Sequence, residues 1–170
     1  MKPVHLKDDL AERCRLAQEI TREAGALAKA AFLNRGSLTV KSKGTQDWVS
    51  NIDLEVEDLI RARLNEFHPD EQILGEEHGG AAGVAGNGMW VVDPIDGTTC
   101  FLLGLPQWCV VLCYVINGAP LVAAIYNPMT SEMYSAISGR GALLNDAPIR
   151  VADADSITAG LVSVGASQHD

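Results

Sequence analysis

The first half of the chain contains two stripes of apolar residues that recur every three or four positions, the period of an amphipathic helix. The first stripe predicts a helix that Asp8 or Asp9 caps and that ends near residues 34–36. Its apolar positions are Leu10, Cys14, Ala17, Ile20, Ala24, Leu27 and Ala31. The second stripe predicts a helix from Ser50 to about Phe67, with inner positions Ile52, Val56, Leu59, Ile60 and Leu64.

Short apolar runs separated by turn-forming residues follow, a pattern typical of β-strands. They lie at residues 73–74, 90–92, 108–116, 121–126, 132–137, 142–144 and 149–151, and a hairpin at 38–49 with a polar turn at 42–46 precedes them. Asn117-Gly118 is a strong hairpin signal. Helices grouped before antiparallel strands predict an α+β fold, a layered α/β sandwich with long helices packed on a largely antiparallel sheet. No linker or repeat divides the chain, so residues 1–170 are predicted to form a single domain.

The start of the second predicted helix carries polar residues with two interpretations. Ser50 and Asp53 have the spacing of a capping box, although Glu or Gln is the usual partner of the capping residue. Taken alone, Asp53 is therefore interpreted as a helix-start residue rather than a metal ligand. The charged positions that follow are interpreted as a solvated face, namely Glu55, Glu57, Asp58, Arg61 and Arg63.

The net charge of the chain and its longest apolar run limit the kinds of partner that it could bind. There are 13 Lys and Arg residues against 22 Asp and Glu residues, which gives a formal net charge of −9. Nucleic-acid binding depends on basic contacts to phosphates, so this balance argues against a nucleic-acid partner. The longest apolar run, residues 108–116, is too short to span a bilayer, so no membrane partner is expected.

The cysteines favour a reducing setting. The four cysteines show no C-x-x-C spacing, which makes a zinc site improbable. Cys109 and Cys113 fall on one face of a predicted strand and are interpreted as small buried apolar residues. The N-terminus lacks a secretory apolar segment, and the cytoplasm is the expected compartment.

The candidate chemistry centres on residues 90–101, Trp-Val-Val-Asp-Pro-Ile-Asp-Gly-Thr-Thr-Cys-Phe. Two carboxylates three positions apart, Asp93 and Asp96, repel each other unless a cation or a proton lies between them. Mg²⁺ prefers oxygen ligands and shares its coordination shell with substrate phosphate. The backbone N–H groups after Gly97 are of the kind that bind anionic oxygens. The stretch therefore predicts a metal and phosphate site.

Other interpretations of these acids remain open. Asp-Pro and Asp-Gly pairs are ordinary turn formers, so the spacing alone also fits a simple turn. Glu76 and Glu77 follow the short run at 73–74 and are candidate ligands, although paired glutamates at a strand end are usually solvated. His78 is interpreted as an exposed loop residue.

Several ordered motifs resemble the inositol monophosphatase family of Mg²⁺-dependent, lithium-sensitive phosphomonoesterases. The segment 90–101 resembles the family signature, 43–53 its lysine-to-aspartate segment, and 73–77 its metal-binding Gly-Glu-Glu segment. Residues 104–106 and 133–145 also match family positions. The resemblance runs from about Leu10 to the end of the chain and corresponds to the N-terminal portion of family members.

The resemblance implies a role for each matched residue. Glu76, Asp93, Asp96 and the carbonyl of Ile95 would hold Mg²⁺, and Asp53 would help to hold a further, weaker ion, two or three in all. Glu76 and Thr98, with Asp53, would orient and activate the attacking water. The backbone N–H groups of Gly97 and Thr98 would bind the phosphate. Inhibition by Li⁺ and a homodimeric state are also implied.

The chain departs from the family pattern in three places. Cys100 stands where the family usually has Asn, and Ser50 where it usually has Thr. Family members also continue for roughly another domain half. That part carries a Trp-Asp motif, whose aspartate completes the metal site, and the residues that select the substrate; nothing in this sequence matches it.

The leading hypothesis is a Mg²⁺-dependent phosphatase of a small phosphorylated metabolite, with inositol monophosphate as the default substrate. Relatives with the same signature act on histidinol phosphate, fructose bisphosphate or phosphoadenosine phosphates. A second hypothesis is a truncated, non-catalytic remnant that binds metal or a partner chain through its exposed sheet. A haloacid-dehalogenase-type phosphatase is disfavoured, because its two aspartates lie two positions apart rather than three.

Overall fold

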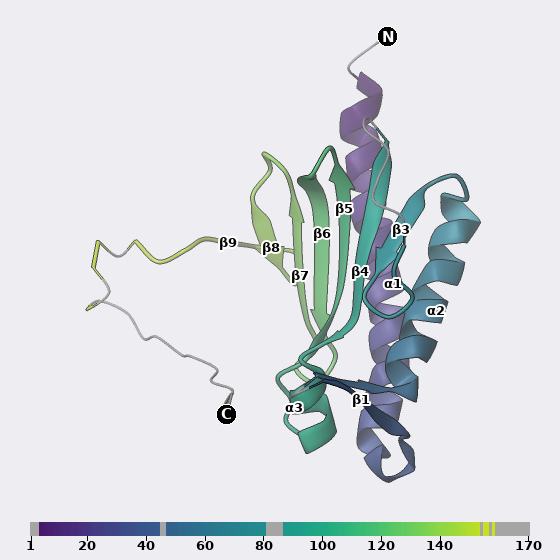
Figure 1. Ribbon diagram of the computed structural model, residues 1–170. Helices are drawn as coiled ribbons and strands as arrows, with labels where there is room; N and C mark the ends of the chain where they lie inside the picture. The colour runs from purple at the N-terminus through teal and green to yellow at the C-terminus, as the bar shows by residue number, and fades with distance from the viewer. Residues whose placement is uncertain (1–3, 45–46, 81–86, 154, 157, 159–170) are drawn as a thin grey trace.

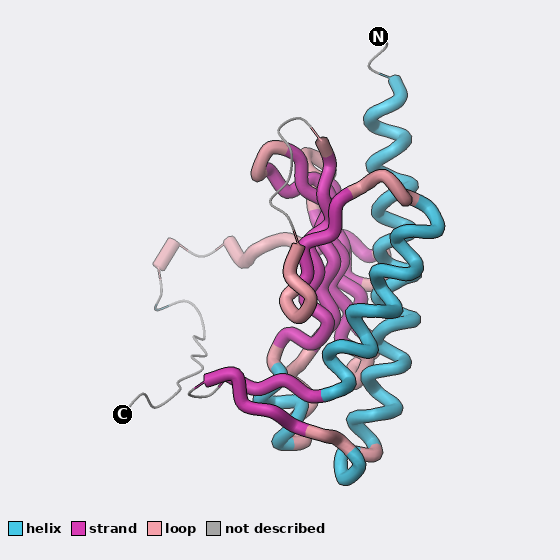
Figure 2. Tube along the Cα trace, turned by 45° about the vertical axis from the view of Figure 1, so that its right-hand side comes forward, coloured by secondary structure: helices cyan, strands magenta, loops and turns pink. Residues whose placement is uncertain are grey.

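The computed structural model describes residues 4–44, 47–80, 87–153, 155–156 and 158, and it has two layers (Figure 1). Helices α1 (Val4–Leu33) and α2 (Asn51–Phe67) form one layer. A seven-stranded sheet forms the other, and Figure 2 shows both helices on the same side of it. The predicted α+β fold with long helices on a largely antiparallel sheet is confirmed. Among the helices described, none is long and apolar enough to cross a membrane.

The sheet is a meander with one parallel pair. Its strands follow the chain order: β3 (Gln72–Gly75), β4 (Gly88–Asp96), β5 (Cys109–Ile116), β6 (Ala119–Asn127), β7 (Glu132–Ile137), β8 (Ala142–Leu144) and β9 (Ala147–Ile149). Strand β3 is parallel to β4, and each later strand is antiparallel to the one before it. The predicted hairpin at Asn117 is confirmed, because Asn117 and Gly118 both have positive φ, as a tight two-residue turn requires.

Three smaller elements surround the end of β4. Strands β1 (Val40–Gly44) and β2 (Asp47–Ser50) form the predicted hairpin as a separate two-stranded sheet. A 3₁₀ turn, η1 (Arg35–Ser37), follows α1. Helix α3 (Thr98–Leu103) directly follows β4. Figure 1 shows that the hairpin and α3 lie at the same end of the molecule.

Three predicted boundaries are wrong. Helix α1 begins at Val4, so neither Asp8 nor Asp9 caps it, and Asp9 instead forms an ion pair with Arg13 at 2.9 Å. The predicted turn at 42–46 begins as strand, because β1 continues to Gly44; residues 45–46 lie outside the described part. The last strand ends at Ile149 rather than continuing to 151, because the chain turns earlier, at residues 145–146, where both φ angles are positive.

The core lies between the helices and one face of the sheet. Helix α1 packs across β5, β6 and β7, and α2 packs on β4. The buried apolar helix positions are Leu10, Cys14, Leu16, Ala17, Ile20, Ala24, Ala28 and Phe32 in α1, and Ile52, Val56, Ile60 and Leu64 in α2. The buried strand positions alternate, as in a sheet with one covered face, and include Trp90, Val92, Val110, Leu112, Val122 and Ala124. The two predicted helical stripes are thus the inner faces of the helices.

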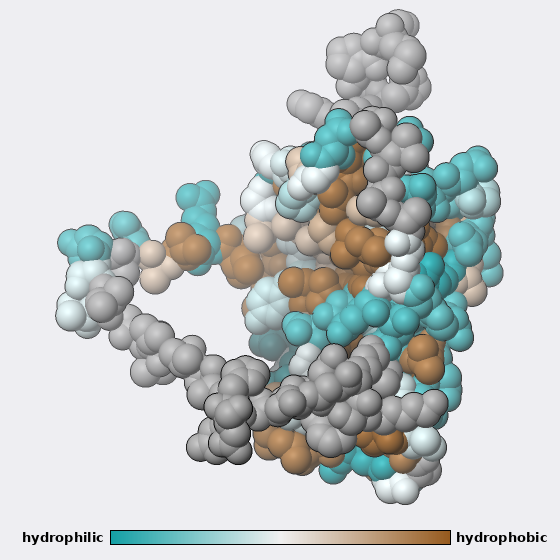
Figure 3. Space-filling view, viewed as in Figure 1, coloured by the Kyte–Doolittle hydropathy of each residue, from teal (hydrophilic) through white to brown (hydrophobic). Residues whose placement is uncertain are grey.

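The opposite face of the sheet is also apolar, and no helix of the described residues covers it. Val111 of β5 lies between Asp93 of β4 and Ile125 of β6, and Ile125 pairs in turn with Tyr134 of β7. Ile125 and Tyr134 are 36% and 37% exposed. In the view of Figure 3 apolar surface gathers over these strands. We call this surface the open sheet face, and define it by Val91, Val111, Cys113, Ala123, Ile125, Tyr134 and Ala136.

The open sheet face corrects the interpretation of two cysteines. Cys109 and Cys113 do share one face of β5, as predicted, but that face is the open one and not the core. Both side chains are half-buried, and both are free thiols. The error arises because an apolar strand with two usable faces does not reveal which face the helices cover.

Three aromatic rings fix α3 against the rest of the fold. The ring of Phe101 lies 4.9 Å from that of Trp108 and 5.4 Å from that of Phe32, and Phe32 and Trp108 are 5.5 Å apart. Phe101 is fully buried, at 0% exposure. This aromatic cluster ties the end of α1 and the segment before β5 to the short helix that follows the acidic strand end. It thereby holds the candidate phosphate loop in place.

We expect Phe101→Ala to lower the free energy of unfolding by about 3–5 kcal/mol, because it leaves a cavity among three packed rings. Leu103→Ala, in the same helix but 72% exposed, should change it by less than about 0.5 kcal/mol. Urea unfolding followed by tryptophan fluorescence measures both. Equal effects of the two substitutions would show that the aromatic cluster does not anchor α3.

Candidate metal and phosphate site

Asp93 and Asp96 lie in the irregular last four residues of strand β4. The pairing of β4 with β5 shifts register between the two acids, so the strand bulges there. Ile95, between them, is 1% exposed and anchors the bulge in the core, whereas Asp96 is exposed and Asp93 half-buried. The two carboxylates therefore belong to an anchored strand end and not to a free surface turn.

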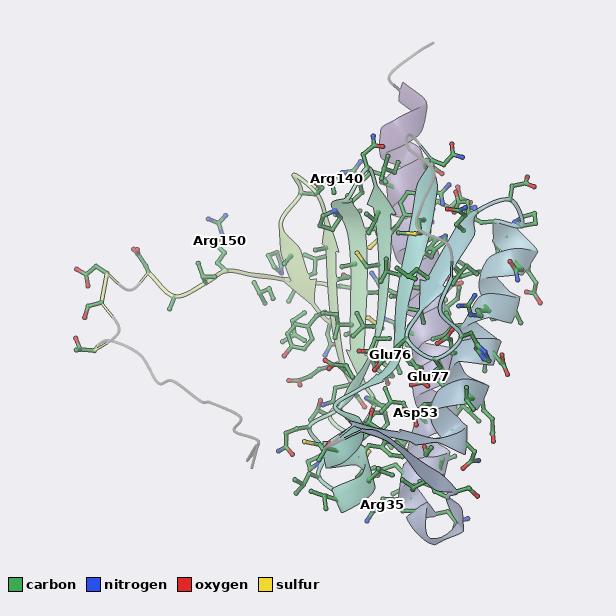
Figure 4. The ribbon with its side chains drawn as sticks, viewed as in Figure 1. Arg35, Asp53, Glu76, Glu77, Arg140 and Arg150 are labelled. Carbon is green, nitrogen blue, oxygen red and sulfur yellow. The ribbon has the colours of Figure 1, made fainter. Side chains whose placement is uncertain are left out.

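Glu76 reaches the same edge of the sheet from β3. The two strands are parallel, with Gly75 opposite Val92, so the residue that follows β3 lies next to Asp93 of β4. The N–H of Glu76 donates to the carbonyl of Val92 at 3.2 Å, which fixes Glu76 beside Asp93. Figure 4 shows Glu76 and Glu77 near Asp53, where the sheet end meets α2, while Arg140 lies at the opposite end of the sheet. The structure therefore brings Glu76, Asp93 and Asp53 to one end of the sheet.

The acids influence one another strongly. Burial, the nearby Glu76 carboxylate, a hydrogen bond shared with Glu76 and the charge of Asp96 together raise the pKa of Asp93 to about 8. The direction of this shift favours the protonated form of the Asp93 carboxyl when no cation is bound. One oxygen of Asp93, Oδ1, is buried without a hydrogen-bond partner. A buried carboxylate oxygen without a partner is costly, and a cation would satisfy it.

The donor set fits a hard divalent ion such as Mg²⁺. The available donors are carboxylate oxygens and a backbone carbonyl, and there is no sulfur or imidazole donor among the residues proposed as ligands. Among the described residues, no three Asp, Glu, His or Cys side chains converge as a closed metal cage. Mg²⁺ usually takes only one or two carboxylates from the protein and completes its shell with water and phosphate. The unpaired Asp93 Oδ1 and the open side at Asp96 suit that kind of site.

Asp53 links the start of α2 to the loop after β4. It is 1% exposed, and its Oδ2 accepts the Ser50 N–H at 2.9 Å and the Ser50 hydroxyl at 2.6 Å. The predicted capping box is confirmed. Its other oxygen, Oδ1, lies 3.5 Å from Thr98 Oγ1, which also donates to the Ile95 carbonyl at 3.0 Å. Asp53 is thus both a helix-start residue and a neighbour of the candidate site, so the two interpretations are compatible.

Gly97 shapes the candidate phosphate loop. Its φ of 90° lies in the left-handed region, where a side chain is strained, and a Cβ there would approach the Gln107 carbonyl oxygen to 2.8 Å. The turn at Gly97 starts α3 at Thr98, and the first N–H groups of a helix have no acceptor within the helix. These groups directly follow the acidic strand end, and phosphate binding by them stays a prediction.

The two residues that depart from the family pattern are both accommodated. The Ser50 hydroxyl bonds to Asp53, a contact that threonine could make equally well. Cys100 is half-buried in α3, and its carbonyl accepts the N–H of Leu105 at 2.9 Å. Nothing in the described residues assigns a role to the Cys100 thiol.

Two residues near the site were misread from the sequence. Cys109 is not a core residue: its thiol lies 3.5 Å from Asp96 Oδ2, and burial together with the charges of Asp96 and Asp93 raises its pKa to about 12. Glu57 is not part of a solvated face but is fully buried, at 0% exposure. A signal for Glu57 existed, since it lies one turn after Asp53 and directly follows the buried stripe position Val56.

His78 is exposed, as predicted. Its Nε2 lies 3.0 Å from an oxygen of Asp58 on α2, so the ring is directed at a helix side chain. The structure therefore provides no support for His78 as a ligand.

Comparison with known proteins shows which family the chain resembles. The model of the inositol monophosphatase family matches residues 9–170. Inositol-1-monophosphatase from Rhizobium meliloti is 37% identical over 150 residues, and the protein named Nus factor SuhB from Pasteurella multocida is 33% identical over 150 residues. In both cases the match covers 88% of this chain and 56% of the relative.

A solved structure shares the fold. The IMPase of Thermotoga maritima matches with a TM-score of 0.77 at 33% sequence identity, covering 84% of this chain and 54% of that one. The chain thus spans about half the length of the relatives it matches. The family match extends over nearly the whole chain and includes the acidic strand ends and the Gly97 loop. This chain belongs to the inositol monophosphatase family.

Proposed function

We propose that this chain provides the metal and phosphate site of a Mg²⁺-dependent phosphomonoesterase. The observation that carries the proposal is the buried, unpaired Oδ1 of Asp93, which lies next to Glu76 where β3 runs parallel to β4. A bound cation would satisfy this oxygen and balance the charge of the neighbouring carboxylates. Membership of the inositol monophosphatase family supports a phosphatase.

Each residue has a proposed role. Asp93, Asp96, Glu76 and the carbonyl of Ile95 hold Mg²⁺, and Asp53 helps to hold a further ion. When bound, Mg²⁺ supplies Lewis acidity toward the phosphoryl oxygens and lowers the pKa of coordinated water. A set of two or three ions, and inhibition by Li⁺, remain predictions from the family resemblance.

The attacking water is oriented by Thr98 and Glu76. The Thr98 hydroxyl donates its proton toward the Ile95 carbonyl and Asp53. Its lone pairs therefore remain available to accept a hydrogen from water. Glu76 accepts the other water proton. The N–H groups of Gly97 and Thr98 hold the phosphate, and the bulge of β4 keeps both sets of groups at fixed separation. The reaction is then an in-line attack of water on phosphorus, in which a new P–O bond forms, the bond to the ester oxygen breaks, and the alcohol leaves on the opposite side.

The proposed substrate is a small phosphorylated metabolite, with inositol monophosphate first among those to test. Histidinol phosphate and fructose bisphosphate are the alternatives. With a net charge of −9 the chain repels an anionic ester, so substrate binding depends on bound cations. The free thiols of the four cysteines agree with the cytoplasm as the proposed compartment.

The open sheet face supports a second candidate function, association with another polypeptide. Large exposed apolar surfaces commonly mark interaction sites, and here Ile125 and Tyr134 lie at the centre of such a surface. A homodimer, which the family resemblance implies, is one form of this association. Catalysis and association are separable by experiment.

We expect the chain, or a version extended to the length of its relatives, to release phosphate from this panel of esters only when Mg²⁺ is present. Asp93→Asn should lower kcat/KM at least about 100-fold, because it removes a charged ligand of the cation that stabilises negative charge in the transition state. Glu55→Gln, an exposed acid on the outer side of α2, should leave it unchanged. Phosphate release that is independent of Mg²⁺ would refute the proposal.

The raised pKa of Asp93 predicts that metal binding releases a proton. At about pH 6.5 Mg²⁺ must displace the Asp93 proton, so nearly one proton per chain should appear in a weakly buffered solution. At about pH 9.5 the group is already ionised and the release should vanish. An indicator dye measures both, and Asp93→Asn should release none at either pH. Release that does not vary with pH would contradict the assignment.

The same pKa predicts how the stability of the metal-free chain depends on pH. Between the ordinary value of 3.8 and about 8, the folded chain holds a proton that the unfolded chain has lost. The free energy of unfolding should therefore fall as pH rises through this window. Urea titrations in a chelator measure the slope, and in Asp93→Asn this contribution should be absent.

If the open sheet face binds another chain, sedimentation should show a mass that grows with concentration. Ile125→Lys places a charge at the centre of that face and should shift the distribution to monomer. Leu33→Lys, at a 70% exposed position at the end of α1, should not. A monomer at every concentration would count against self-association.

A further inference from the structure

Glu57 is a fully buried carboxylate that the proposed mechanism does not use. It lies on α2 one turn after Asp53, with a side-chain exposure of 0%, and it faces the end of β3. Buried acids normally need strong partners. Its partners therefore indicate what it does.

Both oxygens of Glu57 bind the segment that carries Glu76. Oε2 accepts the backbone N–H of Glu77 at 2.7 Å, and Oε1 accepts the N–H of His78 at 3.3 Å. These two N–H groups directly follow Glu76. The carboxylate thus binds the backbone on the C-terminal side of the proposed ligand.

Arg61 completes this arrangement from the next turn of α2. Its Nε donates to Glu57 Oε1 at 2.7 Å, and its Nη2 donates to the carbonyl of Gly79 at 2.6 Å. The guanidinium balances the buried charge and holds the far end of the same segment. Charge-assisted bonds of this kind are stronger than bonds between neutral groups.

Gly75 places the carboxylate against the N-terminal side of Glu76. A Cβ at Gly75 would lie 2.0 Å from Glu57 Oε1, so only glycine leaves room for the acid. The N–H of Gly75 donates to the Gly79 carbonyl at 3.0 Å and closes the segment into a turn. The backbone is therefore fixed on both sides of Glu76, whose own side chain is exposed.

We propose that Glu57 is a positioning residue that presets Glu76 for the divalent cation. The inference rests on the proposed function, because it takes Glu76 as a ligand. Glu57 itself does not reach the ion: both its oxygens are occupied by the segment 77–78 and by Arg61. Holding Glu76 in place before the ion arrives removes the ordering that binding would otherwise require. Groups that orient metal ligands typically change metal affinity 10–100-fold.

The test compares Glu57→Gln with Glu55→Gln, an exposed acid on the same helix. Glutamine keeps the shape of Glu57 but replaces one acceptor oxygen by an N–H₂ group. The hydrogen bonds that this oxygen accepts, either at Oε1 or at Oε2, are therefore lost. Two quantities are measured on the 170-residue chain: amide hydrogen exchange at residues 77–78, and the dissociation constant of Mn²⁺ by electron paramagnetic resonance. Near-UV circular dichroism confirms the native fold.

We expect Glu57→Gln to speed exchange at 77–78 and to weaken Mn²⁺ binding at least about 10-fold, with Glu55→Gln unchanged. Gly75→Ala should reproduce both effects without altering a charged group, because it displaces the carboxylate. The double variant should be less impaired than the product of the two single effects, since both disturb one contact. If Glu57→Gln fails to fold, Gly75→Ala and Arg61→Lys provide the same measurements.

The outcomes separate the two proposals. Failure of the unaltered chain to bind Mn²⁺ would overturn the proposed metal site, while exchange at 77–78 would still test whether Glu57 holds the segment. The inference would be overturned if the unaltered chain binds Mn²⁺ and Glu57→Gln changes the dissociation constant by less than about twofold. Unchanged exchange in both Glu57→Gln and Gly75→Ala would overturn it as well.

Discussion

The mutual repulsion of carboxylates at the ends of β3 and β4 is the constraint on which the site depends. Parallel pairing of the two strands brings Glu76 beside Asp93, and the bulge adds Asp96. Such a group of acids opposes folding unless protons, cations or hydrogen-bond donors compensate it. The protein supplies part of this compensation in fixed form, through the backbone N–H of Ile95, which lowers the pKa of Asp93 against the other effects. What remains unbalanced, at Asp93 Oδ1, is the part left for a ligand.

Rigid packing behind the acids is what makes this concentration of charge tolerable. The acidic strand end is bound on one side by the core residues Ile95 and Val92, and on the other by the aromatic cluster of Phe32, Phe101 and Trp108. Apolar burial far from the charges stabilises the fold, while the charged groups contribute function at some cost in stability. Strain and repulsion commonly gather at functional sites in this way.

Much of this architecture was predictable from the sequence, because it depends on local periodicity. The two helical stripes, the Asn117 turn and the Ser50–Asp53 capping box all follow from short-range rules, and the structure confirms them. The acids at 93 and 96 were recognisable from their spacing and their Gly-Thr-Thr neighbour. The roles assigned to them as ligands remain predictions. The errors at Glu57, Cys109 and Cys113 share one cause: which face of an element is covered depends on distant segments, and spacing along the chain does not encode it.

The close contact between Gly75 and Glu57 has a consequence for how this sequence can change over time. A side chain at 75 has no room while the acid is present, and loss of the acid leaves two N–H groups and Arg61 without their acceptor. A substitution at either position alone should destabilise the segment that carries Glu76, whereas a paired substitution could restore the packing. Gly75 and Glu57 are 18 positions apart in the sequence and should therefore covary across homologous sequences. Such covariation would reflect the proposed metal site, although neither residue would contact the metal.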